Sequence, residues 1–251
     1  EWWGKGFTEW TTASKALPKF DGHYQPHLPA DFGFYDLRVR DVMHKQVKMA
    51  KDHGIDGFCY YYYWFSGHSL LEQPQAAMLA DADLDMPFCL CWANENWTRA
   101  WDAGNTEILI AQEYRDDDDL NFIKSLEPFF RDPRYIRVNG KPLLLVYRPP
   151  PHNMRVDDFS PELPFAQDWN GFAPKMSDIG DLYLNREREE KETVYRGVFP
   201  SWDNTARRGD LGTIILNGTP ENYEYWLSET LKKACQEHEG DDRLVFINAW
   251  N

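Results

Sequence analysis

The densest group of polar and aromatic side chains in the sequence is the run WANENWTRAWD at 92–102, which follows a compact apolar segment. Amides and carboxylates bind sugar hydroxyls, and indole faces cover the C–H faces of pyranose rings. The alternative is a capped loop in which the rings belong to the core and Glu95 pairs with Arg99 at helical spacing. Because a structural loop has little need for two Asn residues beside a Glu, we favour a sugar-binding site with Glu95 as a catalytic candidate. The predicted binding residues in this run are Asn94, Asn96, Trp97, Arg99 and Trp101.

A second group of aromatic, acidic and histidine side chains lies near the start of the sequence, in WWGKGFTEW (2–10) and GHYQPHLP (22–29). Residues 1–36 show neither a helical nor an alternating period, which predicts a packed loop region. A single His in such a loop is more often a packing residue than a catalyst; this is our interpretation of His27, whereas His23 fits either role. The candidates for substrate binding here are Trp3, Glu9, Trp10, His23 and Tyr24.

Further candidates stand at the ends of other strand-like runs. The tyrosines at 60–63 must alternate across their strand, and the sequence does not reveal which of them face inward. We include Tyr63 and Trp64 because they are nearest the carboxyl end. Asp203 in FPSWDNTARR (199–208) is a second catalytic candidate, although a helix N-cap is the commoner role for such a residue. The remaining binding candidates are Tyr147, Arg148, Trp202, Asn248 and Trp250.

Helical and apolar patterns alternate along the chain. Helices are predicted over 37–53, 70–81, 117–131 and 220–237, the last begun by Thr219 as N-cap and Pro220. Buried strands are predicted over 55–65, 86–93, 141–148, 195–203 and 243–251. This alternation indicates an α/β fold with a parallel sheet covered by helices. A doubly wound sheet would also fit, but several strands end in polar and aromatic residues and no glycine-rich phosphate loop occurs, which favours a (β/α) TIM-type barrel.

Composition excludes several classes of partner. The formal net charge of −14 opposes binding to nucleic acid or to an anionic membrane surface. No apolar stretch approaches the roughly 20 residues needed to cross a bilayer, so membrane insertion is not expected. The cysteines form no CxxC pair, which is typical of reduced thiols in a cytoplasmic protein. The seven His are scattered, and HExxH, GxSxG and P-loop motifs are absent, so we predict neither a metal nor a cofactor.

Several long motifs, in order, resemble those of the WbsX-like family, whose members are described as glycosyltransferases of surface-polysaccharide gene clusters and are similar to the family-99 endo-α-mannosidases. The motifs are WWGKGFTEW, GHYQPHLPADFGFYDLR, GIDGFCYYYYWF, FCLCWANENWTR, DPRYIRVNGKPLLLVYRP, YRGVFPSWDNTARR and LVFINAWN. The resemblance covers 2–150 and 195–251. It implies a (β/α) barrel that acts on oligosaccharides or polysaccharides with α-linkages, with Glu95 and its neighbours at the sugar-facing end. It also implies either a retaining glycoside hydrolase or, as the alternative, a glycosyltransferase of O-antigen and lipopolysaccharide biosynthesis.

The sequence departs from the family pattern at three places. A strand and a short loop expected before WWGKGFTEW are absent. The family motif Glu-Trp-x-Glu-Gly, whose two Glu residues resemble the catalytic pair, would follow Asn251, so we expect this pair to be missing from the chain. YRPPPHN at 147–153 resembles two family motifs joined without the strand and helix between them. We therefore expect one incomplete domain over 1–251 with an incomplete barrel, which leaves open a third possibility, a catalytically inactive glycan-binding remnant.

Overall fold

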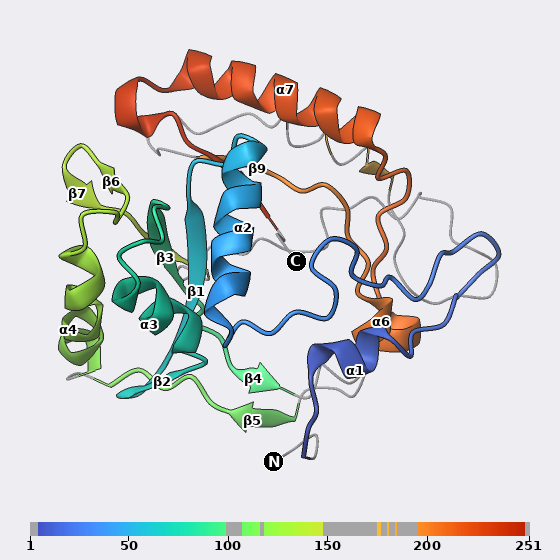
Figure 1. The fold of residues 1–251 in the computed structure, drawn as a ribbon, viewed down its shortest axis with the longest axis horizontal. Helices are drawn as coiled ribbons and strands as arrows, with labels where there is room; N and C mark the ends of the chain where they lie inside the picture. The colour runs from blue at the N-terminus through green and yellow to red at the C-terminus, as the bar shows by residue number, and fades with distance from the viewer. Residues whose placement is uncertain are drawn as a thin grey trace. The chain divides into compact units, whose positions relative to one another are not determined.

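The computed structural model describes residues 5–98, 107–115, 118–147, 175–176, 180, 184 and 195–248 (Figure 1). The chain divides into two compact units. Unit 1 consists of residues 1–28, 100–105 and 155–251, and unit 2 consists of residues 29–99 and 106–154. The single domain expected over 1–251 stays a prediction.

Unit 2 is built on a four-stranded sheet with the order β2-β1-β3-β8. Its strands are β1 (Phe58–Phe65), β2 (His68–Leu70), β3 (Phe88–Trp92) and β8 (Leu144–Val146). The aromatic and β-branched residues of these runs suit a pleated, buried surface. β1 pairs with β3 and β3 with β8 in parallel, whereas β2 returns antiparallel to β1. The parallel pairing predicted for these three strand runs is confirmed.

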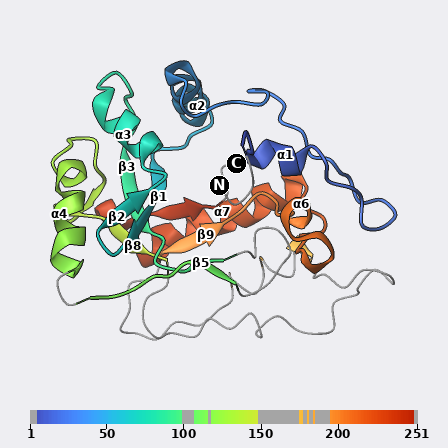
Figure 2. The same ribbon diagram turned by 90° about the horizontal axis from the view of Figure 1, so that it is seen from below.

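Three helices cover one face of this sheet, namely α2 (Arg40–Asp52), α3 (Gln73–Ala80) and α4 (Asp118–Phe130) (Figure 2). They agree with the predicted ranges to within three residues at each end, and Gly54 follows α2 with a positive φ of 75°. The core between helices and sheet contains Met43, Val47, Ala50, Met78, Phe122, Leu126 and Phe129 from the helices and Tyr62, Trp64, Phe88 and Leu90 from the strands. The apolar residues that recur at helical spacing in these three helices therefore form the side of each helix that packs on the sheet.

Alternation along β1 separates its side chains between the two faces of the sheet. Tyr62 and Trp64 are buried against the helices, where both rings contact Phe122. Tyr61 and Tyr63 point to the opposite face, and Tyr61 remains 44% exposed. The structure thus answers the question of parity that the sequence left open.

Two short hairpins extend unit 2. β4 (Trp97–Thr98) follows β3 in the sequence and pairs antiparallel with β5 (Ile108–Ile110). β6 (Arg137–Val138) pairs with β7 (Lys141–Pro142) across Asn139 and Gly140, whose φ angles of 51° and 75° fit a two-residue type I′ turn.

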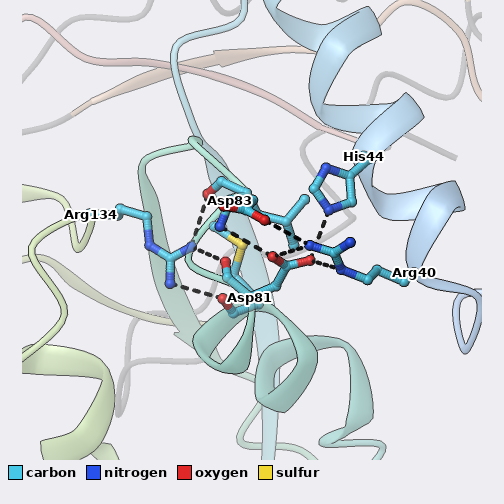
Figure 3. A network of polar contacts seen from close by, with 7 residues as sticks. Arg40, His44, Asp81, Asp83 and Arg134 are labelled. Atoms are coloured by element: carbon cyan, nitrogen blue, oxygen red, sulfur yellow. Dashed lines mark hydrogen bonds and ion pairs between the residues drawn. The ribbon is translucent and has the colours of Figure 1, made fainter.

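Arg134 joins the end of α3 to the start of β3 in unit 2 (Figure 3). Its Nη1 donates to the carbonyl oxygens of Asp81 (2.8 Å) and Leu84 (2.9 Å), and its Nη2 donates to that of Met78 (2.8 Å). Its Nε and Nη2 also donate to the carboxylate of Asp132, at 2.9 and 2.7 Å. One guanidinium therefore satisfies one carbonyl group near the end of α3, two carbonyl groups of the loop that follows, and one acidic side chain.

The Asp81 carboxylate extends this network to α2 (Figure 3). It accepts two hydrogen bonds from Arg40, at 2.6 and 2.8 Å, and lies 2.8 Å from Nε2 of His44. The guanidinium of Arg40 holds the pKa of Asp81 well below its usual range. The helix is thus fastened to the loop that enters β3.

Unit 1 contains α1 (Glu9–Ala13), β9 (Arg196–Val198), α6 (Thr205–Arg208), the 3₁₀ turns η3 (Gly209–Leu211) and η4 (Gly240–Asp242), α7 (Pro220–Glu237) and β10 (Val245–Ile247). β9 and β10 pair in parallel. Helix α7 begins as predicted, with Thr219 Oγ1 accepting the N–H of Asn222 at 3.3 Å. In the described part of the expected loop region, residues 5–36, the structure contains a short helix, α1, that the lack of periodicity did not indicate.

Within the described ranges, no helix combines the length and the apolar character needed to cross a bilayer. Whether the two sheets belong to one barrel stays a prediction.

Candidate functional site

Four aromatic rings form a continuous strip in unit 2, on the face of the sheet opposite the helices. The Trp97 ring lies 5.3 Å from that of Tyr63, and Tyr63 lies 6.2 Å from Tyr61. Tyr61 in turn lies 6.0 Å from Tyr147, which follows β8 and is 47% exposed. We call these four residues the aromatic strip. Tyr63, Trp97 and Tyr147 were predicted site residues; Tyr61, which connects them, was missed because the parity of β1 was unknown.

The two Asn residues beside Glu95 hold a neighbouring segment in place. Asn94 is 7% exposed, and its Nδ2 donates to the Tyr114 hydroxyl at 3.3 Å, while that hydroxyl donates to the Asn94 carbonyl at the same distance. The Oδ1 of Asn96 accepts the backbone N–H of Gln112 at 2.6 Å. These amides therefore position residues 112–114, which we call the 112–114 segment.

Glu95 lies directly between these two residues, just after β3, and its side chain is half-buried. Its backbone N–H donates to the Ala93 carbonyl at 3.0 Å, which turns the chain at the end of the strand. A carboxylate at this position can accept hydrogen bonds from sugar hydroxyls or transfer a proton. No group of three or more His, Cys, Asp or Glu side chains in the described part of the chain is placed to hold a metal ion.

Trp64 was predicted to bind substrate, but the structure places it in the core. It is 7% exposed, and its Nε1 donates to both carboxylate oxygens of the buried Asp118, at 3.1 and 3.0 Å. The reason is the two-residue period of a strand, which sends Trp64 to the helix side when Tyr63 faces the other way. A position near the carboxyl end of β1 was therefore not enough to assign Trp64 to the site.

Asp203 in unit 1 is the centre of a second polar cluster. Its Oδ1 accepts the backbone N–H (2.9 Å) and the hydroxyl (2.6 Å) of Thr205. Its Oδ2 lies 2.9 Å from Nε2 of the buried His23 and accepts from Nε2 of Gln25 at 2.5 Å. Because Nδ1 of His23 accepts the N–H of Lys19 at 3.0 Å, the proton that His23 shares with Asp203 lies on Nε2.

This geometry makes Asp203 an anchor for the loop at 19–25. The N-cap of α6 is Asn204, so Asp203 does not have the N-cap role that was expected as the commoner one; its bonds to Thr205, two residues further on, form a local turn just before the helix. Burial by itself would raise the pKa of Asp203, but hydrogen bonds from Thr205 and His23 outweigh it and hold the pKa below its usual value. Asp203 is thus ionised and fully engaged at neutral pH.

This pKa shift predicts how the cluster contributes to stability as pH changes. A carboxyl group whose pKa is lower in the folded than in the unfolded state, where it is about 3.9, stabilises the fold above that pH. The contribution is lost as pH falls through the lowered folded value. We expect Asp203→Asn to lower the urea midpoint at pH 7, with the difference from wild type shrinking below about pH 4. A difference that stays constant from pH 7 to pH 3 would contradict this account.

The other predicted residues of unit 1 lie in varied surroundings. Glu9 accepts from Nε of Arg207 at 3.0 Å at the surface, and Trp10 is half-buried. Tyr24 is 70% exposed and contacts the ring of His27 edge-on. Trp202 is 37% exposed. Asn248 is exposed, and its backbone N–H donates to the Val198 carbonyl at 2.8 Å. Trp3, Arg99, Trp101, Arg148 and Trp250 lie outside the described residues.

A strip of aromatic rings beside amide and carboxylate groups is the kind of surface that binds carbohydrates. Comparison with known families agrees with this class. The family described as glycosyltransferase WbsX matches residues 1–156 and 166–251, and the chain belongs to this family of carbohydrate-active proteins.

Two relatives come from strains of Xanthomonas campestris pv. campestris, and each is called uncharacterized protein WxcX. Each is 40% identical to this chain over 301 aligned residues, which cover all of this chain and 43% of the relative. The chain therefore spans less than half the length of these relatives. Since the alignment is longer than the 251 residues of this chain, the relatives contain residues within it that this chain lacks. No solved structure matches the chain.

Proposed function

We propose that this chain binds an α-linked glycan of a surface polysaccharide at the aromatic strip and the adjoining end of β3, as part of a carbohydrate-active enzyme. The observation that carries the proposal is the contact of Trp97, Tyr63, Tyr61 and Tyr147 in one strip. Sugar rings stack on such aromatic faces. Glu95, with Asn94 and Asn96, lies in the loop between the end of β3 and Trp97. We further propose that the parallel strands of unit 2 are part of an incomplete (β/α) barrel, a fold whose chemistry lies at the carboxyl ends of the strands.

For the reaction, we propose hydrolysis with retention as the first candidate. One carboxylate would take the proton of the sugar 2-hydroxyl as its oxygen attacks the anomeric carbon, and a second, protonated carboxyl group would donate its proton to the leaving oxygen. Water would then open the new bond at the anomeric carbon, which gives net retention. Two carboxyl groups at a fixed separation are needed for this chemistry. Glu95 is our candidate for one of them, because it stands at the strand end beside the strip. Asp203 is a weaker candidate, because its two oxygens are engaged by Thr205, His23 and Gln25.

Transfer of a sugar is the second candidate, favoured by the description of the family. A transferase needs an activated donor such as a sugar nucleotide. A donor that binds only the folded protein raises its melting temperature by mass action. A rise with a sugar nucleotide, together with no cleavage of oligosaccharides alone, would favour transfer. Cleavage without a donor would favour hydrolysis, and binding without either reaction would favour a glycan-binding remnant.

The binding site itself is tested by removing one ring of the strip. We expect Trp97→Ala to weaken binding of mannan-type or O-antigen-type oligosaccharides about tenfold, equivalent to about 1.4 kcal/mol, because the indole face is lost. Isothermal titration calorimetry measures this change. Tyr225→Ala is the matched control, since Tyr225 is 60% exposed on α7 and outside the strip. Equal affinities of Trp97→Ala and wild type would rule out the strip as the binding surface.

A further inference from the structure

The side-chain amide of Gln112 is buried without a partner. Its Nε2 and Oε1 are both inaccessible to solvent, and neither forms a hydrogen bond with any residue that the structure describes. Buried amides normally pair both their donor and their acceptor, because an unpaired buried polar group lowers stability. The unpaired amide of Gln112 therefore lowers the free energy of unfolding, and no hydrogen bond to its side chain compensates for this loss within the described residues.

The backbone around this amide is held firmly. Asn96 accepts the N–H of Gln112, and the hydroxyl of Ser66, which follows β1, donates to the Glu113 carbonyl at 3.0 Å. The Tyr114 hydroxyl exchanges two hydrogen bonds with Asn94. The 112–114 segment is thus fixed to the ends of both β1 and β3. A costly side chain on a well-fixed segment is typical of a functional site, where strain is retained for binding.

A second unpaired donor lies close by. The Nε1 of Trp92, at the end of β3, is also buried and has no hydrogen-bond partner among the described residues. The Trp92 ring packs against Phe122 of α4, with 4.4 Å between centroids, and edge-on against Tyr114 of the 112–114 segment at 6.0 Å, so it lies on the helix side of the sheet. Gln112 is also two residues beyond Ile110, the register partner of Trp97 in the aromatic strip. Gln112 therefore follows the strand that pairs with Trp97 of the strip, whereas the unpaired donor of Trp92 belongs to the helix side of the sheet.

We infer that Gln112 is a sugar-binding residue whose amide donates one hydrogen bond to, and accepts one from, the glycan at this strand end. The inference rests on the proposed function and deepens it. A primary amide matches a pair of neighbouring hydroxyls or an acetamido group, each of which offers both a donor and an acceptor. Because the two atoms are covered, the sugar reaches them after a local movement of the surrounding side chains. A buried amide discriminates strongly against ligands that leave it unpaired.

The test separates stability from binding. Gln112→Met removes both polar atoms and keeps the length of the side chain, and Gln112→Leu is the second apolar variant. We expect each to leave the melting temperature unchanged or to raise it by about 2 to 4 °C, because the unpaired amide is gone. We expect each to weaken binding of the same mannan-type or O-antigen-type oligosaccharides at least tenfold. Gln25→Met is the matched stability control and should melt earlier, since Gln25 Nε2 donates to Asp203 at 2.5 Å and its Oε1 accepts the N–H of His27 at 3.0 Å.

The outcomes distinguish the inference from the proposed function. If wild type binds and both apolar variants bind equally well, Gln112 is not a sugar-binding residue while the site survives. If both variants melt several degrees below wild type, the amide is structural and the inference fails. If wild type binds none of the oligosaccharides, the proposed function fails and the inference fails with it. Weakened binding at unchanged or raised melting temperature supports both.

Discussion

Replacing Glu95 with Gln is expected to lower the turnover of mannan-type or O-antigen-type oligosaccharides by about 100-fold to 10,000-fold, the range for loss of one general acid or base. Gln keeps the size and polarity of the side chain but can neither take up nor release the proton. Because Glu95 lies in the loop after β3, between two Asn residues that bond to the 112–114 segment, the change should leave the fold intact. Initial rates of product release at saturating oligosaccharide, measured by chromatography, give this effect.

Glu127→Gln is the matched control for this experiment. Glu127 lies on α4, is 56% exposed and pairs with Arg131, so its loss should change turnover less than twofold. Turnover by Glu95→Gln within threefold of wild type would remove Glu95 from the chemistry. If the wild-type chain binds oligosaccharide but shows no turnover, the chain is instead a binding remnant.

Arg134→Lys is expected to have the largest effect on stability, lowering the free energy of unfolding by about 3 kcal/mol or more. The guanidinium is 15% exposed and bonds to three backbone carbonyls and to the carboxylate of Asp132, which is 10% exposed. A Lys ammonium cannot reproduce this planar set of donors, so several buried acceptors lose their partners. Chemical denaturation monitored by tryptophan fluorescence measures the change.

Arg131→Lys provides the comparison, because Arg131, directly after the end of α4, is 78% exposed and pairs with Glu127 at the surface. Its free energy of unfolding should change by less than about 0.5 kcal/mol. If both variants unfold at the same denaturant concentration as wild type, Arg134 does not hold the loop between α3 and β3 together.

Much of unit 2 was predictable because its signals are local. Apolar residues at helical spacing gave α2, α3 and α4 nearly to their observed ends, and compact apolar runs gave β1 and β3. The face to which each side chain of β1 points was not predictable, because period-2 alternation has two phases and both faces carry aromatic residues. Trp64 was assigned to the wrong face for this reason, and Tyr61 was missed.

Strand-end reasoning selected Tyr63, Trp97 and Tyr147, whose rings lie in one strip with that of Tyr61; their role in binding a sugar stays a prediction. Gln112 carried no comparable signal, since a single Gln after a short apolar run is common in loops. Its significance depends on three-dimensional facts, namely burial without a partner and fixation of its backbone by Asn96. For Asp203, base rates favoured the N-cap of the following helix, but Asn204 is the N-cap and Asp203 instead bonds to Thr205, His23 and Gln25.

The most direct test of the aromatic strip as a glycan-binding surface is a fluorine NMR titration of protein labelled with 5-fluorotryptophan. The Trp97 resonance, assigned by its loss in Trp97→Phe, should shift saturably as mannan-type or O-antigen-type oligosaccharide is added. The resonance of Trp226, which is 2% exposed in the core of unit 1, should stay in place. A bound oligosaccharide that leaves the Trp97 resonance unmoved would show that the glycan binds elsewhere.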